Sequence, residues 1–332
     1  MSKQASVKLV KAPALRRGDL IQIHAPAYPL TVDRLGLAVD RFESKGFQVS
    51  VARNARLVHG YLAGSDQKRA KALNAAMADP EIRAIACARG GYGVMRVLDR
   101  LDFEPLRQDP KVIFGYSDIT ALLLAAHSRV GLIGFHGPMP VVELIGPHAD
   151  FGFQWLDRAM APRPAGEVPN DGAVSLRPGI GRGPLLGGCL SLLSHMCGTG
   201  YLPSFDGSIL FWEEVGEPPY RIDRQLTQLR LAGHLENLAG MVVGQLTDCL
   251  PEQGKPSLTV EQVILDVTAG TDYPILFGMP FGHVSRQITL PIGIQALLEA
   301  GEASGRLVFE EAATRSARAR RLSPGRRAPA RR

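Results

Sequence analysis

The sequence lacks the patterns by which metal centres and nucleotide-binding loops are usually recognised. It has four cysteines in 332 residues, none of them in a C-x-x-C pair, and no H-E-x-x-H segment, so a zinc site is not expected. The G-x-G-x-x-G and G-x-x-x-x-G-K-[ST] fingerprints are missing as well. We therefore expect a protein that uses neither a metal ion nor a cofactor.

Long apolar runs are also missing. No uncharged stretch reaches the roughly 18 residues that a membrane-spanning helix needs, and the first 17 residues hold no apolar segment typical of a secretory signal. These absences predict a cytoplasmic protein without a membrane partner. In that reducing compartment we expect Cys87, Cys189, Cys197 and Cys249 to be free thiols.

The positive charge of the chain is concentrated at its end. The formal net charge is +6, but the last 18 residues contain 8 arginines and no acid, which leaves 6 − 8 = −2 for the rest. This arginine-rich segment has prolines, a glycine and no apolar periodicity, so we expect residues 313–332 to be disordered. A solvated tail and a contact to nucleic acid or anionic lipid are both compatible with it. The folded part is not expected to bind nucleic acid.

The first half of the chain alternates between strand and helix patterns. Short apolar runs at 20–25, 47–52 and 82–88 predict strands, and amphipathic segments at 32–45 and 66–79 predict helices between them. Short strands that alternate with helices are typical of a mostly parallel sheet with helices on both faces. Ligands of such sheets bind at the carboxyl ends of the strands.

Prolines and glycines are frequent between residues 146 and 183, where we place a domain boundary. The second half mixes strands and helices. The predicted divisions are an N-terminal extension at 1–16, an α/β domain at 17–165, a linker at 166–180, a smaller domain at 181–312 and the tail at 313–332.

The segment K-V-I-F-G-Y-S-D at 111–118 is the first candidate for a reactive site. An apolar strand at 112–114 leads into Gly115, which allows a sharp turn, and Ser117 lies at the tip of that turn. A helix-forming run follows, with Asp118 in its first turn. Such an arrangement places a hydroxyl beside the free N–H groups of a helix N-terminus, so we interpret Ser117 as a nucleophile.

The glycine-rich segment R-G-G-Y-G at 89–93 also lies between a predicted strand and a predicted helix. Three interpretations are open. The segment could cradle a phosphate, it could bring backbone N–H groups close to a reacting oxygen, or it could be a tight turn without a chemical role.

A serine nucleophile needs a base, usually a histidine, and a group that orients it. Among the eight histidines, His127 lies too far along the helix after Ser117, and His195 lies in an apolar helical stripe typical of the core. His136 is a candidate for lining the site. His283 stands out because it follows the small-residue turn P-F-G, where a scaffold can present a catalytic group.

Three acids follow the apolar run at 209–212 and are candidates for the orienting group. Glu213 and Glu214 come directly after the run, and Glu217 follows shortly after. Carboxylates next to a buried strand are costly unless they are paired or functional. The alternative is a set of ion pairs with arginines of the Y-R-I-D-R segment that follows.

Four segments in this order resemble the LD-carboxypeptidase family of serine peptidases, also called muramoyltetrapeptide carboxypeptidases. They are R-G-G-Y-G at 89–93, G-Y-S-D-I-T at 115–120, E-E-V-G-E-P-P-Y-R-I-D-R at 213–224 and F-G-H…T-L-P-I-G at 281–293. The resemblance extends over residues 15–310. It implies a flavodoxin-like N-terminal domain and a smaller C-terminal domain, with the site assembled between them.

The resemblance also implies roles for individual residues. Ser117 would be the nucleophile, His283 the base and Glu213 the orienting carboxylate. The backbone N–H groups of Gly91 and Asp118 would stabilise the oxyanion.

The implied reaction releases the terminal D-Ala from a murein tetrapeptide in the cytoplasm. Arg89 and Arg221 are guesses for the cation that binds the D-Ala carboxylate, and a homodimer is expected. The alternatives are a microcin-immunity-like peptidase that acts on an acyl-nucleotide or another amide, and a peptide-binding protein without catalysis. The sequence departs from the family at Cys189, where asparagine is common, and at Glu214, where aspartate is usual.

Overall fold

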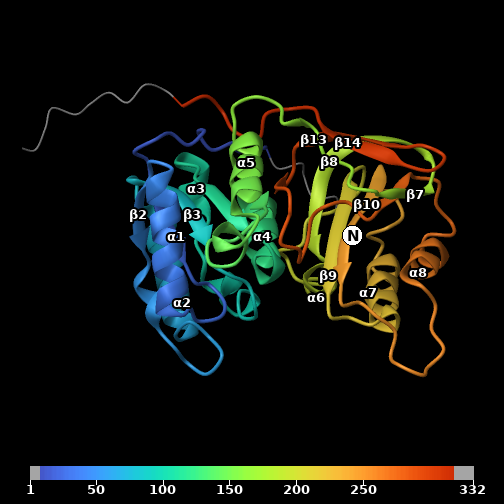
Figure 1. Ribbon diagram of the computed structural model, residues 1–332, viewed down its shortest axis with the longest axis horizontal. Helices are drawn as coiled ribbons and strands as arrows, with labels where there is room; N and C mark the ends of the chain where they lie inside the picture. Colours follow the sequence, from blue (N-terminus) through green and yellow to red (C-terminus); the bar gives the residue numbers. More distant parts are fainter. Residues whose placement is uncertain (1–7, 318–332) are drawn as a thin grey trace, which may run out of the picture.

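The computed structural model describes residues 8–317. It contains two β-sheets that lie side by side, each with its own helices (Figure 1). The first sheet has the order β12-β5-β4-β3-β1-β2. Its strands are β1 (Leu20–His24), β2 (Gln48–Val51), β3 (Ile82–Cys87), β4 (Val112–Gly115), β5 (Phe135–His136) and β12 (Leu290–Pro291). The five strands from the N-terminal half are parallel, in the order 2-1-3-4-5 of flavodoxin-like folds.

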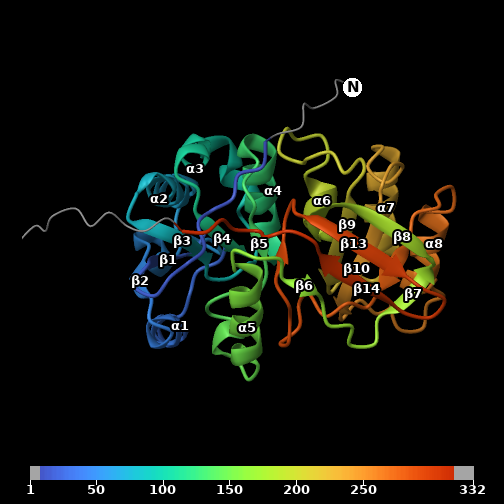
Figure 2. The ribbon, with the colours of Figure 1, turned by 90° about the horizontal axis from the view of Figure 1, so that it is seen from above.

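Helices cover both faces of the first sheet, as the α/β prediction requires (Figure 2). On one face lie α1 (Val32–Ser44) and α5 (Ala149–Ala159), and on the other lie α2 (Asp66–Ala78), α3 (Glu104–Gln108) and α4 (Thr120–Val130). The amphipathic helix α1 buries Phe42 against Phe153, with ring centroids 5.3 Å apart. Helix α4 is buried nearly all round because it lies between its own sheet and the second half of the chain.

The second sheet is mixed and has the order β6-β14-β13-β8-β9-β10-β11-β7. Its strands are β6 (Gly166–Glu167), β7 (Val174–Arg177), β8 (Gly179–Cys189), β9 (Ile209–Val215), β10 (Gly240–Thr247), β11 (Ile275–Phe277), β13 (Gln295–Ala300) and β14 (Gly305–Phe309). The four central strands β8 to β11 are parallel. Helices α6 (Leu190–His195), α7 (Pro219–Leu231) and α8 (Val260–Val267) pack beside them.

Two elements differ from the sequence prediction. Strand β9 continues to Val215, so Glu213 and Glu214 lie inside the strand rather than after it. The segment after the R-G-G-Y-G loop forms a 3-10 helix at Met95–Arg100 instead of starting an α-helix. Both differences arise because tertiary packing overrides local propensity: β9 is held between β8 and β10 along its length.

The domain boundaries remain a prediction. The structure shows which strands and contacts lie at these positions. Residues 166–180 contribute β6 and β7 to the second sheet. Strand β12 comes from the C-terminal half and pairs with β5 of the first sheet. Near the chain ends, Ala14 N–H donates to the carbonyl of Arg315. Most of the arginine-rich tail, 318–332, lies outside the described residues.

Within residues 8–317, no helix is long and apolar enough to cross a bilayer. No group of three histidine, cysteine or acidic side chains in this part of the chain is placed to hold a metal ion.

Candidate active site

Ser117 lies in a strained turn between β4 and α4. Its φ angle is 62°, in the left-handed region that few residues other than glycine adopt. The turn is tight because Gly115 precedes it with φ 149°, and a Cβ atom there would lie 3.0 Å from Cβ of Cys87. Strain of this kind is typical of a nucleophile lifted above the end of a sheet.

The R-G-G-Y-G loop lies directly against Ser117. A Cβ atom on Gly90 would be 2.8 Å from Oγ of Ser117 and 3.4 Å from the backbone nitrogen of Asp118. The N–H groups of Gly91 and Asp118 make no backbone hydrogen bond in the described chain. Both donors are therefore free for an oxygen atom beside the serine hydroxyl. Of the three interpretations of this loop, the geometry favours the oxyanion site.

Buried polar contacts hold this loop in place. The carboxylate of Asp118 accepts a hydrogen bond of 2.9 Å from the N–H of Val94. The fully buried Arg69 donates to the carbonyls of Pro26 and Gly93 at 2.5 and 2.7 Å. Burial raises the pKa of Asp118 to about 6, although the Val94 hydrogen bond and the charge of Arg69 lower it. These contacts join the turns after β1 and β3 to the serine turn.

His283 and Glu213 form a hydrogen-bonded pair. Nδ1 of His283 is 2.7 Å from Oε2 of Glu213, whose side chain is fully buried. Burial lowers the pKa of His283, but the hydrogen bond and negative charge of Glu213 outweigh it, so the pKa lies above its usual 6.5. The sequence predicted both residues, and the fold brings them together from β9 and a loop 70 positions later in the chain.

The loop that carries His283 is fixed to strand β10. Oγ1 of Thr247 donates to the carbonyl of His283 at 2.9 Å, and the side chain of Gln245 donates to the carbonyl of Gly278 at 2.6 Å. Gly282 has φ 116°, and a Cβ atom there would lie 2.9 Å from Oε2 of Glu213. The glycine before the histidine is thus required for the His–Glu pair to form.

The two halves of the site meet at Tyr116. The ring of this residue, directly before Ser117, lies 4.8 Å from the ring of His283. Its hydroxyl donates to Oε1 of the buried Glu143 at 2.7 Å. Although both side chains are described, the structure contains no hydrogen bond between Ser117 and His283. Sequence reasoning missed Glu143, because an acid in a Pro- and Gly-rich segment gives no signal.

Glu214, the acid after Glu213 in β9, has structural partners. Glu214 accepts hydrogen bonds from the N–H and hydroxyl of Ser191, and the thiol of Cys189 lies 3.7 Å from its carboxylate. The cysteine that departs from the family pattern therefore lies at the start of α6 and contacts the carboxylate of Glu214 in β9. The core assignment of His195 is wrong: it faces solvent at the end of α6.

The two guessed arginines differ in their surroundings. Arg221 lies 3.3 Å from the carboxylate of Glu217, as the ion-pair alternative predicted, and its side chain is half exposed. Arg89 is half buried and lies over the ring of Tyr28, with Cζ 5.5 Å from the ring centroid. It pairs with no acid among residues 8–317, so its charge is available to a ligand.

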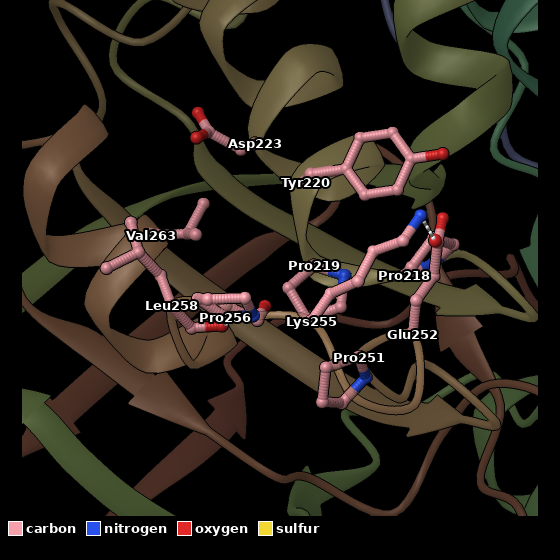
Figure 3. Close-up of a pocket in the computed structure, with 11 residues that line it drawn as sticks. Pro218, Pro219, Tyr220, Asp223, Pro251, Glu252, Lys255, Pro256, Leu258 and Val263 are labelled. Atoms are coloured by element: carbon pink, nitrogen blue, oxygen red, sulfur yellow. Dashed lines mark hydrogen bonds and ion pairs between the residues drawn. The ribbon is translucent and has the colours of Figure 1, made fainter.

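A groove of about 460 Å³ lies between the start of α7 and the loop before α8 (Figure 3). Prolines, Tyr220 and the ion pair between Lys255 and Glu252 form its wall. It lies near the ends of β9 and β10, as do Glu213 and the anchor of the His283 loop. Neither Ser117, Glu213 nor His283 lines it, so the reacting groups are not in this groove.

The fold and the site are those of a peptidase of the α/β class. The N-terminal domain model of the LD-carboxypeptidase family matches residues 21–137, and the C-terminal domain model matches residues 182–298. The chain belongs to the LD-carboxypeptidase family and is a hydrolase of peptide bonds. This confirms the resemblance and the fold class predicted from the sequence.

Relatives of the chain carry names that agree with this family. The chain is 36% identical to the probable murein peptide carboxypeptidase of Bacillus subtilis (strain 168), over 88% of this chain and 92% of the relative. It is 32% identical to the murein tetrapeptide carboxypeptidase of Pseudomonas aeruginosa, over 84% and 92%. The microcin C7 self-immunity protein MccF of Escherichia coli is 27% identical, over 88% and 93%.

Two solved structures have the same fold. The muramoyltetrapeptide carboxypeptidase from Oxalobacter formigenes superposes with a TM-score of 0.78 at 28% identity, over 88% of this chain and 99% of that one. An MccF-like protein from Bacillus anthracis superposes with a TM-score of 0.82 at 25% identity, over 90% and 99%.

Proposed function

We propose that the protein is a serine carboxypeptidase that releases the terminal D-Ala from murein tetrapeptides through a Ser117–His283–Glu213 triad. The observation that carries this proposal is the 2.7 Å contact between His283 and Glu213 beside the strained serine turn. The names of the murein peptide relatives support the substrate. We also propose a cytoplasmic enzyme, as the family resemblance implies.

In the proposed mechanism, Ser117 attacks the carbonyl of the scissile amide while His283 accepts the hydroxyl proton. Glu213 holds the imidazole with Nδ1 as the donor, which leaves Nε2 to act as base. The N–H groups of Gly91 and Asp118 stabilise the oxyanion, and loss of one such donor typically costs about 10²–10³ in rate. His283 then protonates the leaving amine of D-Ala, and water hydrolyses the acyl-enzyme.

The decisive test is mass spectrometry of a tetrapeptide digest by the wild type and by Ser117→Ala. The wild type is expected to yield tripeptide and D-Ala, whereas the variant, with an unchanged melting temperature, is expected to yield none. Equal release by both proteins would refute the triad.

We further propose that Arg89 is the stronger candidate for the cation that binds the substrate carboxylate. Its guanidinium pairs with no described acid, whereas Arg221 is engaged by Glu217. Arg89→Gln should raise KM about tenfold or more, and Arg221→Gln is the matched control that should change KM less than about twofold, since buried or partly buried carboxylate pairs are worth more than exposed ones. A larger effect at Arg221 would reverse this assignment.

The second candidate function is that of a microcin-immunity-like peptidase with the same triad and an acyl-nucleotide substrate. The similarity to MccF favours it. Parallel assays with a murein tetrapeptide and an aminoacyl sulfamoyl adenosine separate the two. We also propose a homodimer, which analytical ultracentrifugation tests directly.

A further inference from the structure

A cluster of buried polar atoms without hydrogen-bond partners lies behind the His–Glu pair. The side chains that carry them are fully buried. The atoms are Nδ1 and Nε2 of His136, Oε1 of Glu213, and Oγ1 of Thr289. None of these atoms takes part in the contacts assigned to the proposed mechanism, which uses only the other carboxylate oxygen of Glu213.

The cluster lies where the two sheets meet. His136 is the last residue of β5 and pairs with Gly115 on one side and with Leu290 of β12 on the other. A Cβ atom on Gly137 would lie 2.7 Å from Oγ1 of Thr289, so the threonine is close to this strand end. Glu213 reaches the same place from β9, and its charge acts on His136.

Aromatic rings surround His136. Its ring lies 5.3 Å from Phe211, 5.7 Å from Tyr116 and 6.3 Å from Phe281. Around the polar cluster the packing is thus apolar, and bulk water has no access. A buried polar atom without a hydrogen-bond partner is destabilising, so several such atoms in one place are expected to share a partner. Buried water with two to four polar partners is the usual way in which such groups are satisfied.

His136 is uncharged at neutral pH. Burial lowers its pKa to about 4, against a smaller upward effect of Glu213, and the charge of His283 lowers it further. A neutral imidazole has one N–H donor and one acceptor nitrogen. It can therefore donate to one water molecule, which donates in turn to a carboxylate oxygen, and accept from another water molecule at the same time.

We propose that His136 is a positioning residue that donates, through buried water shared with Thr289, to Oε1 of Glu213. This contact fixes the rotamer in which the other carboxylate oxygen holds His283, and it stabilises the buried negative charge. The role of Glu213 rests on the proposed function, but the water site itself does not.

The kinetic test compares His136→Phe with His136→Asn. Phenylalanine keeps the ring packing and removes both nitrogens, so kcat should fall about 10- to 100-fold, by analogy with the loss of an outer-shell partner of a metal ligand, with KM nearly unchanged. Asparagine keeps a donor and an acceptor and should restore part of the loss. In His136→Phe the carboxylate of Glu213 loses its water contact and attracts the proton on His283 more strongly. The pKa of His283 should therefore rise, and the acidic limb of kcat/KM should move to higher pH.

The control is His234→Phe, a histidine that packs on Phe205 in the second half and should leave kcat and the limb unchanged. Unchanged kcat in His136→Phe would overturn the proposal, as would a loss of kcat without a shift of the limb and without rescue by asparagine. If the wild type releases no D-Ala at all, the proposed function has failed instead.

A crystal structure of the wild-type protein at high resolution tests the water site without any assay and without a variant that could misfold. Water is expected within hydrogen-bond distance of both Oε1 of Glu213 and a ring nitrogen of His136. A cluster that contains no water at this position overturns the proposal.

Discussion

Two glycines near the proposed site, Gly90 and Gly282, matter because a side chain at either position would clash with a neighbouring polar group. A Cβ atom on Gly90 would touch the hydroxyl of Ser117, and a Cβ atom on Gly282 would lie 2.9 Å from the carboxylate oxygen of Glu213 that holds His283. Glycine is usually discussed as a source of flexibility. Here the missing side chain matters for the proposed site, because the hydroxyl of Ser117 and the carboxylate of Glu213 lie where a Cβ atom would be.

Gly90→Ala is expected to abolish turnover while the fold persists. The added methyl group would lie 2.8 Å from Oγ of Ser117, which forces the hydroxyl or the oxyanion loop to move, and kcat should fall by at least about 10²-fold, as when an oxyanion donor is lost. The control is Gly36→Ala in α1, where nothing lies within 4 Å and alanine should stabilise the helix by about 1 kcal/mol or less. Steady-state kinetics and thermal melting measure both effects, and an active Gly90→Ala enzyme would contradict the site geometry.

The pH profile should report the His283–Glu213 pair. Because the folded-state pKa of His283 lies above 6.5, kcat/KM should fall as the pH drops through that value and the base becomes protonated. Glu213→Gln removes the negative charge, so the limb should move to lower pH and kcat should drop by about 10³–10⁴-fold.

The same pair should affect stability with a defined sign. A raised histidine pKa adds stability that is complete below the unfolded value of 6.5 and disappears as the pH rises through the folded value. The wild type should therefore exceed Glu213→Gln in melting temperature by more at pH 6 than at pH 9. An equal difference at both pH values would show that His283 does not gain a proton on folding.

At the scale of elements, the site depends on loops that follow neighbouring strands. The turns after β1, β3 and β4 meet at one sheet edge, and the buried guanidinium of Arg69 on α2 joins the first two. The His283 loop is fixed in the same way to the end of β10 by Thr247. The loops of the proposed site are thus held by side-chain to backbone hydrogen bonds rather than by regular secondary structure.

Arg69→Met tests this anchoring. The substitution leaves the carbonyls of Pro26 and Gly93 without their donor and removes a fully buried partner of Asp66, so we expect a loss of about 3–5 kcal/mol in unfolding free energy. In the fraction that folds, kcat should fall because the loop that carries Gly91 loses its support. Arg96→Met is the control: it pairs with the same Asp66 from the exposed side, and denaturant unfolding should detect little change.

On the scale of the whole molecule, activity requires the two sheets to keep their relative position. Strand β8 and helix α6 rest on the start of α4, where the N–H of Cys189 donates to Oγ1 of Thr120 at 3.1 Å. Ser117, the proposed nucleophile, precedes this contact by three residues, and His283, the proposed base, comes from the opposite half. A small displacement at the contact therefore separates the two reacting groups.

Gly188→Ala should lower kcat although the residue touches no reacting group. A Cβ atom there would lie 2.3 Å from Cγ2 of Thr120 and would push the second half away from α4. We expect a loss of about 10²-fold, since a misplacement of about 1 Å at a reacting pair has effects of that size. Gly270→Ala, with nothing within 4 Å, is the control, and small-angle scattering with kinetics measures both variants. Full activity of Gly188→Ala would mean that the interface tolerates a shift.

The sequence by itself determined the parallel first sheet, the serine turn and the family, because alternating apolar runs, Gly115 before Ser117 and four ordered motifs are local features that packing did not alter. Only the tertiary structure decided that β9 extends through Glu213, that β12 joins the first sheet, that Glu143 accepts from Tyr116, and that His136 packs among Tyr116, Phe211 and Phe281. These contacts join residues far apart in the chain. They follow from strand order and from the way one half packs on the other, which no local pattern encodes.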